Sequence, residues 1–573
     1  MTRPLRTYSL LLVLILSYLS GQAQDSLATS SSQTAQSSWT VSGAIQHESL
    51  FPTVDISDER TAPRPKWALI DHLSNTYVDV GVRYDHQREN KAGFTGLSVA
   101  TRGELLEWPM LGYEPDFRGY GISHLHVESD FNWGSVTVGD VYGQFGSGLI
   151  LRLYEDRFLG VDNALRGGKI ALTPYKGIFV EALGGKQRRY WNCYQDHAWG
   201  WNYSQDAVMG ANLELDIAQW SPRMLEAGAN LTFGASYVSK YQAFDTIIAE
   251  TNYYYNVPKW VGAGDLRAGF SMKGWNALLE FAYKANDPGF ENNFSFRPGT
   301  ALLASLSYSR KGFSAIVQAR RAENMSFRSL RMGYGLSGQI NYLPPFAYQH
   351  TYMLPSLNSY ATQLNGEWAF QAELTYTWKR KTPMGGRYGT TLKFHGSHIR
   401  GLGLKWGDLP ETYYTDVHLE LNKRVAKDWY LNAMLMYQEY NQTVVEGHGP
   451  MERAMIGVVD VKWATSKNVQ MRAELQYLFS HEDNGQWIFA LYELSLWKQL
   501  MLSFSELYCI GHSVEAENEE GHHFYSAMAT WQRGSHRLSA GYVKTLPGYN
   551  CSGGVCRYVP KQEGVMITYD FTW

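Results

Sequence analysis

The chain has 573 residues, of which 14% are aromatic, and its formal net charge is −3 at pH 7. This near-neutral charge gives no argument for binding to nucleic acid or to a strongly charged partner. A soluble domain of this length would usually divide into smaller units. No linker follows residue 40, which favours one large closed architecture.

The first residues have the pattern of a secretory signal peptide. Arg3 and Arg6 precede an apolar run, and small residues follow it up to Ala23. The run is too short for a membrane-spanning helix, so we expect a signal peptide (1–23) that is cleaved after export. The polar, low-complexity stretch 24–38 is expected to form a flexible periplasmic leader.

Apolar and polar residues alternate in many later stretches. In 366–378 (GEWAFQAELTYTW), Trp368, Phe370 and the other residues of the same parity are mostly apolar, whereas glutamate, glutamine and threonine fill the other positions. Stretches 411–422 and 467–479 repeat this pattern. A period of two indicates a strand with one apolar and one polar face. These runs have about the length of a tilted strand that crosses a bilayer, and aromatic residues gather at their ends, as at the headgroup level.

Short and long connections alternate along the chain. Tight turns are expected at 272–274, 310–312, 425–427, 466–467, 498–499 and 533–534. Long connections are expected at 187–205, 239–263, 287–298, 323–365, 399–410, 439–449, 511–520 and 545–562. Membrane barrels have this arrangement, with short periplasmic turns and long outer loops.

The predicted fold class is therefore all-β: a transmembrane antiparallel β-barrel formed by residues 39–573, with about 24 strands within a range of roughly 18–26. The strands are expected at 39–47, 77–86, 94–101, 119–128, 133–142, 167–173, 176–186, 206–218, 225–238, 264–273, 275–286, 299–310, 312–322, 366–379, 387–398, 411–423, 428–438, 450–463, 467–479, 486–497, 499–510, 521–532, 535–544 and 564–573. The alternative is a soluble β-sandwich or propeller, whose strands would usually be shorter and less aromatic.

Segment 139–168 is the least barrel-like part of the chain. Glycines surround Phe145, and six charged residues follow within fifteen positions: Arg152, Glu155, Asp156, Arg157, Asp162 and Arg166. We expect a gating loop that crosses the lumen, narrows it and pairs with wall residues such as Glu373, Arg472 or Glu474. The glycines also match a weak phosphate-loop pattern, but no lysine–serine pair and no βαβ unit accompany them.

The same segment carries a family resemblance. Its runs GDVYGQFGSG and LGVDNALRGG, with the signal peptide and the overall length, resemble a family of uncharacterised outer-membrane barrels from the Bacteroidota. The resemblance covers essentially the whole mature chain. It implies residence in the outer membrane and supplies no substrate and no catalytic residues.

The four cysteines are Cys193, Cys509, Cys551 and Cys556. An exported protein meets an oxidising compartment, where cysteines can pair. Cys551 and Cys556 bracket a short glycine-rich loop and are the disulfide candidates. Free thiols and a Cys193–Cys509 pair stay open, because the sequence does not choose among the three possible connectivities.

Histidines occur as close pairs: His124 and His126, His395 and His398, and His522 and His523 with His512 nearby. A metal site needs several converging ligands with supporting hydrogen bonds, so we interpret these residues as ordinary polar-face histidines. No spacing selects a nucleophile together with its base. The sequence thus predicts no metal, no cofactor and no catalytic residue.

The last ten residues (GVMITYDFTW) alternate apolar and polar side chains and end on an aromatic residue. They resemble the closing strand of bacterial outer-membrane barrels, whose terminal aromatic residue the assembly machinery reads. Tyr569, Phe571 and Trp573 are the candidates for this assembly signal.

The leading functional hypothesis is an outer-membrane channel or gated pore for an unidentified solute, because a barrel of this size is too wide for its side chains to fill. The alternative is a structural barrel subunit of a larger outer-membrane complex for protein assembly, secretion or nutrient uptake, and an outer-membrane hydrolase ranks third. The expected partners are outer-membrane lipid, the β-barrel assembly machinery during insertion and, under the alternative, other outer-membrane proteins.

Overall fold

The structure is a computed structural model that describes residues 37–54, 72–86, 93–113, 117–189, 191, 206–242, 247–250, 253–333, 338–403, 411–482, 485–510 and 523–573. The expected signal peptide and nearly all of the expected leader lie outside the described residues. None of the described helices has the length and apolar character needed to cross a membrane.

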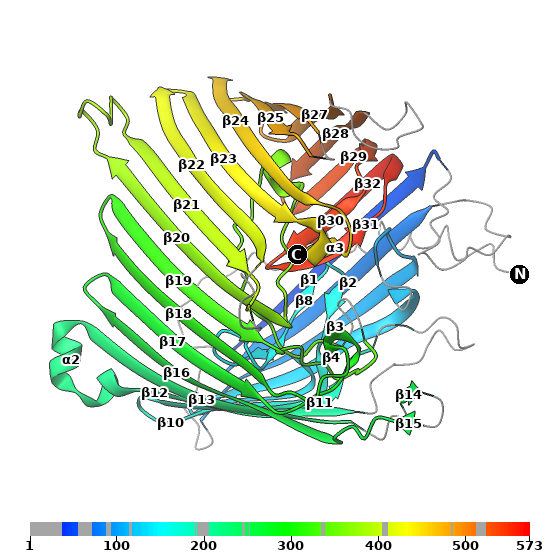
Figure 1. The fold of residues 1–573 in the computed structure, drawn as a ribbon, viewed down its shortest axis with the longest axis vertical. Coiled ribbons are helices and arrows are strands. Elements are labelled where there is room, and N and C mark those ends of the chain that lie inside the picture. The colour runs from blue at the N-terminus through cyan, green and yellow to red at the C-terminus, as the bar shows by residue number, and fades with distance from the viewer. Residues whose placement is uncertain are drawn as a thin grey trace, which may run out of the picture.

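Twenty-four antiparallel strands form one closed sheet (Figure 1). They are β1 (Ser38–Pro52), β2 (Leu73–Asp85), β3 (Phe94–Trp108), β4 (Gly119–Phe131), β5 (Gly134–Val141), β10 (Leu165–Tyr175), β11 (Ile178–Gln187), β12 (Ala207–Asp216), β13 (Ala229–Tyr241), β16 (Trp260–Met272), β17 (Trp275–Lys284), β18 (Gly299–Arg310), β19 (Phe313–Glu323), β20 (Gly366–Trp378), β21 (Thr390–Arg400), β22 (Thr412–Ala426), β23 (Trp429–Asn441), β24 (Met451–Ser466), β25 (Val469–Ser480), β26 (Trp487–Leu496), β27 (Leu500–Cys509), β28 (His523–Arg533), β29 (His536–Thr545) and β32 (Gln562–Thr572). Every expected strand overlaps one of these, and the predicted barrel is confirmed.

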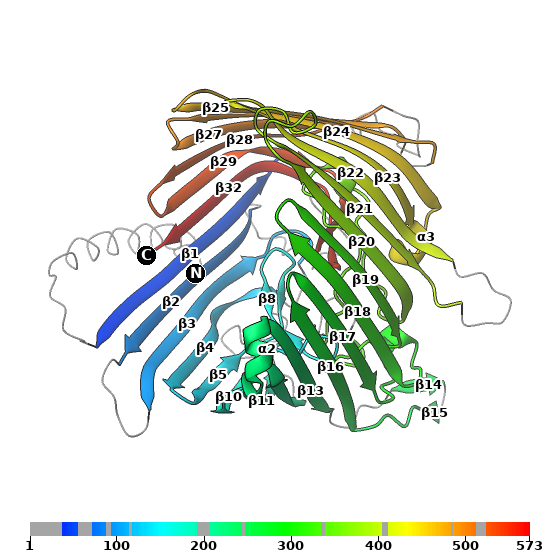
Figure 2. The ribbon, with the colours of Figure 1, turned by 90° about the vertical axis from the view of Figure 1, so that its left-hand side faces the viewer.

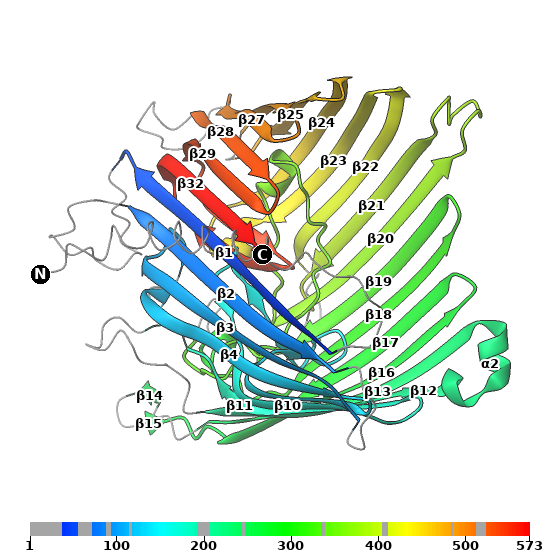
Figure 3. The ribbon, with the colours of Figure 1, turned by 180° about the vertical axis from the view of Figure 1, so that it is seen from behind.

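The barrel closes where β1 pairs with β32 (Figure 3). The backbone N–H of Gly43 donates to the carbonyl oxygen of Trp573 at 3.2 Å, and the N–H of Trp573 donates to the carbonyl of Gly43 at 3.1 Å. A Cβ atom on Gly43 would lie 2.1 Å from the Trp573 ring. Glycine at this position therefore leaves the space that the terminal ring occupies.

The outer face of the strands is apolar and exposed. Along β20, Phe370, Leu374 and Tyr376 are exposed, whereas Glu367 and Ala369 on the other face are buried. The alternation follows the period of two expected from the sequence, because successive side chains of a strand point to opposite faces. Figure 2 shows the strands running obliquely around the barrel.

Aromatic pairs lie at the short-turn end of several strands. The rings of Trp275 and Tyr308 have centroids 4.6 Å apart, and those of Trp429 and Trp463 are 5.4 Å apart. Each pair joins two neighbouring strands near the turn end. Such aromatic belts are typical of the level at which membrane lipid meets water.

One connection at the short-turn end differs from expectation. The sequence pattern predicts a strand from residue 225, but α2 (Pro222–Ala227) occupies its start and β13 begins at Ala229. Proline is tolerated in the first helical turn, and Gly228 ends the helix with φ 64°, which glycine adopts without steric cost. With η2 (Ile217–Trp220), this makes the connection longer than a tight turn.

The long connections lie at the opposite end and contain the remaining short elements. These are β6 (Gly143–Gln144), β7 (Arg152–Leu153), β8 (Glu155–Asp156), β9 (Val161–Asp162), β14 (Ile248–Glu250), β15 (Tyr253–Tyr254), η3 (Phe290–Asn292), η4 (Leu354–Ser356), α3 (Gln442–Glu446), β30 (Gly548–Ser552) and β31 (Val555–Val559). Three of these connections fold back against the inner wall and form the candidate site.

Candidate functional site

The candidate site is the lumen at the long-loop end, where three parts of the chain lie against the inner wall. We call residues 142–164 the inner segment, residues 324–365 the inner loop and residues 548–559, which form β30 and β31, the inner hairpin. In Figure 1, β8, β30 and β31 are seen within the ring of barrel strands.

The first part of the inner segment reaches the wall formed by β12 to β17. Phe145 is fully buried, and its ring occupies the space beside Gly210 of β12, where a Cβ atom would lie 2.7 Å from the ring. The backbone N–H of Ser147 donates to both carboxylate oxygens of Glu280 on β17, at 3.1 Å each. This end of the segment is thus held by packing and by a buried carboxylate.

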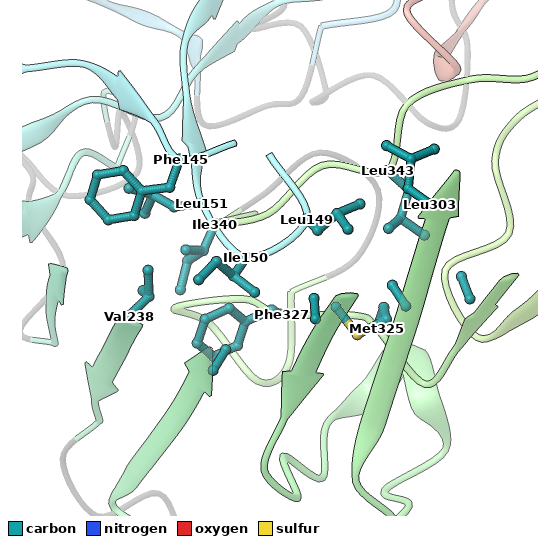
Figure 4. Packing of buried hydrophobic residues seen from close by; sticks show 14 of the residues in the cluster. Phe145, Leu149, Ile150, Leu151, Val238, Leu303, Met325, Phe327, Ile340 and Leu343 are labelled. Carbon is teal, nitrogen blue, oxygen red and sulfur yellow. The ribbon is translucent and has the colours of Figure 1, made fainter. Parts of the chain in front are cut away.

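The inner segment and the inner loop share one apolar core. Leu149, Ile150 and Leu151 lie in the same buried cluster as Phe327, Ile340 and Leu343 of the inner loop (Figure 4). Val238 of β13 and Leu303 of β18 supply the wall side of this cluster. Because both parts of the chain bury apolar surface against each other and the wall, they form one packed unit.

The charged part of the inner segment reaches a different wall, formed by β1 to β3. Arg157 donates to Asp79 on β2 at 2.8 Å and to Gln46 on β1 at 3.0 Å. Glu155 accepts from Arg102 on β3 at 2.8 Å and from Arg157 at 2.8 Å. The segment therefore contacts inner-wall strands on both sides of β5 and β10, the two strands that it connects.

Asp162 lies in a buried ionic cluster at the end of the inner segment. It accepts hydrogen bonds from Arg188 and, at 3.0 Å, from the hydroxyl of Tyr142. Arg188 also donates to Glu104 on β3 at 2.7 Å. Burial disfavours the charged carboxylate, but Arg188 and Arg102 outweigh this effect and hold the pKa of Asp162 below its usual value.

The other charged residues expected for the gating loop, Arg166, Asp156 and Arg152, also have partners. Arg166, at the start of β10, donates to Asp140 of β5 at 2.7 Å. The carboxylate of Asp156 accepts from the N–H of Leu159 at 3.1 Å. The guanidinium of Arg152 lies 3.8 Å from the ring centroid of Tyr342, which belongs to the inner loop. Arg152 thus adds a cation–π contact between segment and loop.

The partners expected for these charges are not the ones that the structure shows. Arg472 on β25 pairs with Asp460 and Glu474 instead, and Glu373 on β20 accepts from Gln371. All belong to the wall strands from β20 to β25, against which the inner loop lies. The sequence could indicate that the charges need partners but not which wall the segment meets.

The inner loop begins at a buried ion pair and crosses to the far wall. Arg320 of β19 donates to Glu367 of β20 and to the carbonyl oxygen of Pro344 in the loop, and the side chains of Arg320 and Glu367 are fully buried. Farther along, the N–H of Leu354 donates to Gln476 of β25 at 2.8 Å. Leu354 is fully buried among apolar residues of β23 to β28.

The structure does not group the histidines in the pairs that they form in the sequence. His395 and His398 are three residues apart on β21 and point to opposite faces, so that His395 is buried and His398 is bound to Thr415 at 3.0 Å on the outer face. His395 instead lies opposite His418 of β22 in the strand register. His350 of the inner loop joins this group.

The other histidines of the predicted pairs contact residues on their own or a neighbouring strand. His124 and His126 lie side by side on β4 with ring nitrogens 2.7 Å apart, and His523 lies 2.7 Å from Glu506. His512 and His522 lie outside the described residues.

A cavity of about 330 Å³ lies between the inner loop and the inner hairpin. Its lining is rich in aromatic and polar side chains and includes Tyr348, His350, Tyr360, Tyr414 and Tyr549. In the hairpin, Cys551 and Cys556 face each other and form a disulfide. Cys509 is buried at the end of β27, and Cys193 lies outside the described residues.

The chain belongs to the family of unknown function DUF6029, which it matches over residues 5–573. No curated protein matches the sequence. The chain is similar to the P pilus usher (PapC) translocation pore, with 9% identity, a TM-score of 0.36 and coverage of 93% of this chain and 99% of that chain. It is similar to the siderophore receptor PirA from Acinetobacter baumannii, with 7% identity, a TM-score of 0.37 and coverage of 95% and 81%. It is also similar to OccK3 (OpdO) from Pseudomonas aeruginosa, with 12% identity, a TM-score of 0.36 and coverage of 82% and 96%.

Proposed function

We propose that the protein is an outer-membrane β-barrel that lets a solute pass, and that the inner segment and the inner loop gate its lumen. The observation that carries the proposal is that the inner segment contacts inner-wall strands on both sides of its own pair of strands. A connection held in this way lies across part of the lumen and narrows it.

The exterior of the barrel supports residence in a membrane. The apolar side chains of Leu266, Val317 and Leu435 are 65%, 60% and 68% exposed and point outward from three separate strands. In water, such a surface would favour association with other apolar surfaces. In lipid it is the stable arrangement, because a closed barrel leaves no unpaired strand edge and satisfies its backbone hydrogen bonds internally.

The interior supports passage of a solute. Barrels with about this number of strands are too wide for wall side chains to fill, and they are commonly plugged. Here the inner wall carries both signs of charge, as in Arg102, Asp79, Arg472 and Asp460. This mixture gives no basis for strong selection of anions or cations, so the class of solute stays open in the proposal.

Deleting part of the inner segment tests the gate. Removing Phe145–Ala164 and joining the ends with a short glycine–serine link preserves β5 and β10. The shortened protein should insert normally and show a higher single-channel conductance in planar bilayers and faster entry of antibiotics into cells. A matched control replaces residues 217–228, the connection with η2 and α2 at the short-turn end, by a tight turn. Its conductance should equal that of the wild type.

Two outcomes would refute the proposal. If the shortened protein inserts with unchanged conductance, the inner segment does not gate the lumen. If the wild-type protein purifies in mild detergent with stoichiometric partner proteins and neither form conducts, the barrel acts as a structural subunit of a larger complex.

A further inference from the structure

A buried group of histidines and an aspartate connects the inner loop to the barrel wall. His350 of the inner loop lies with its Nε2 atom 2.7 Å from Oδ2 of Asp416 on β22. His418, also on β22, lies with Nδ1 2.9 Å from Oδ1 of the same carboxylate. Asp416 and His418 share the inner face, because residues two apart in a strand point to the same side.

These three side chains converge as metal ligands do. One ligand atom from each residue lies within 4.8 Å of the other two, and the side chains of His350, Asp416 and His418 are only 3%, 0% and 2% exposed. An ion with bonds of about 2.0–2.2 Å to nitrogen and oxygen holds its ligand atoms roughly 3–3.5 Å apart. To hold an ion, the two imidazole nitrogens, which lie 2.7 and 2.9 Å from the carboxylate oxygens, must move slightly away from them.

The surroundings supply the supporting contacts that metal ligands usually have. The hydroxyl of Tyr414 donates to Asp416 at 3.4 Å. The ring centroid of Tyr348 lies 4.9 Å from that of His350 and 4.8 Å from those of His395 and His418. The hydrogen bond from Tyr414 orients the carboxylate, as partners of metal ligands do, and the ring contacts keep the imidazoles in the group.

His395 supplies an independent observation. It lies 2% exposed beside His418, with ring centroids 4.8 Å apart, and its Nδ1 atom is buried without a hydrogen-bond partner. A buried imidazole nitrogen without a partner is costly, so that His395 adds an unsatisfied ligand-type atom next to the group.

We propose that His350, Asp416 and His418 bind one divalent first-row transition-metal ion of the Zn²⁺ class, with a remaining coordination position open to the adjoining cavity. Two imidazoles and one carboxylate are ligands that suit such ions, whereas Ca²⁺ and Mg²⁺ prefer oxygen ligands alone. His350 and Tyr414 line the cavity beside the group, so that water or a small ligand can reach the open position. The ion would fasten the inner loop to β22, whether or not the barrel conducts a solute.

The test measures metal binding to the full mature protein, purified in detergent without a polyhistidine tag and stripped with a chelator. We expect about one equivalent of Zn²⁺ to bind, and Co²⁺ to give visible absorption bands that Zn²⁺ abolishes. His350→Gln, Asp416→Asn and His418→Gln should each weaken binding at least about tenfold. His398→Gln and His523→Gln are matched controls outside the group and should leave binding unchanged.

Two results would overturn the proposal, and folding of each variant is checked by its heat-modifiable migration on gels. The first is the absence of the expected binding: either a folded His350→Gln protein binds Zn²⁺ as tightly as the wild type, or the wild type binds no Zn²⁺. Either outcome would mean that the three side chains are joined by hydrogen bonds only. The second applies even if the variants do not fold: X-ray absorption of the wild type with Zn²⁺ that shows only oxygen ligands excludes the histidines.

Discussion

The inner segment and the inner loop are held to the barrel wall in two different ways. The charged end of the inner segment depends on Arg157 and Asp79, whose side chains are 22% and 29% exposed. The base of the inner loop depends on Arg320 and Glu367, whose side chains are fully buried. Water screens the first pair, which contributes about 0–1 kcal/mol, whereas removing one partner of a buried pair costs about 3–5 kcal/mol. The charged end of the inner segment is therefore easier to release than the base of the inner loop.

Breaking the buried pair should have the largest effect. In Glu367→Ala, the guanidinium of Arg320 stays buried without its carboxylate, and the hydroxyl of Tyr360 loses its acceptor. The free energy of unfolding should fall by about 3–5 kcal/mol, as measured by urea titration of the folded barrel. Glu373→Ala is the matched control on the same face of β20, and it should cost about 1 kcal/mol or less. Equal losses in the two variants would mean that the buried pair holds the base of the loop no more firmly than an ordinary hydrogen bond on the wall does.

We expect an intermediate loss of stability when low pH protonates Asp162 at the buried end of the inner segment. Because the pKa of Asp162 is lowered in the folded protein, the stability that its carboxylate contributes is fully present above its unfolded pKa of about 3.9. That contribution is lost as the pH falls further, through the lower folded value. Asp162→Asn should therefore be less stable than the wild type at pH 6 and lose less stability on acidification, as urea titrations between pH 6 and pH 2 would measure. Identical pH profiles would show that Asp162 does not hold the segment.

The smallest effect on stability is expected at the partly exposed pair of Arg157 and Asp79. Arg157→Ala removes contacts with Asp79, Gln46 and Glu155, and should lower the free energy of unfolding by about 1 kcal/mol or less. Conductance in planar bilayers should nevertheless rise, and the difference from the wild type should shrink at high salt, because salt already weakens the pair in the wild type.

Arg321→Ala is the matched control for Arg157→Ala. Arg321 pairs with Glu323 at 2.6 Å, and the two side chains are 28% and 27% exposed, but the pair lies on the outer face of β19. This variant should leave conductance unchanged at every salt concentration. A change of conductance equal to that of Arg157→Ala would mean that charge loss anywhere on the barrel, and not release of the inner segment, alters the pore.

The strands were predictable because their signal is local. Along β20, the parity that places Trp368 and Phe370 outside and Glu367 inside can be read from the residues themselves. The start of β13 was not predictable from alternation alone, because Pro222 and Gly228 define a short helix there. The sequence evidence for this helix lay in two residues that favour helix ends, Pro222 and Gly228, and not in a periodic pattern of apolar residues.

The interior was predictable only in part, because its contacts join residues far apart in the sequence. The density of charge in the inner segment indicated that ion pairs would hold it, but Asp79 and Arg102 have no sequence feature that marks them as its partners. Parity alone could have separated His395 from His398, which are three residues apart on one strand. No periodicity places His350 beside Asp416, since that contact depends on the path of the inner loop.

The seam between β1 and β32 bears on the order of events in folding. Gly43 and Trp573 are paired across nearly the whole length of the chain, so that their contact has the greatest loop-closure entropy to overcome. Neighbouring hairpins such as β16–β17 can form early, since a tight turn joins them. We expect the closing pair to form last, and until it forms both strands expose unpaired backbone groups that can join another chain. A larger residue at position 43 would meet the terminal ring, so we expect it to hinder this closure and to favour aggregation of the unfinished sheet.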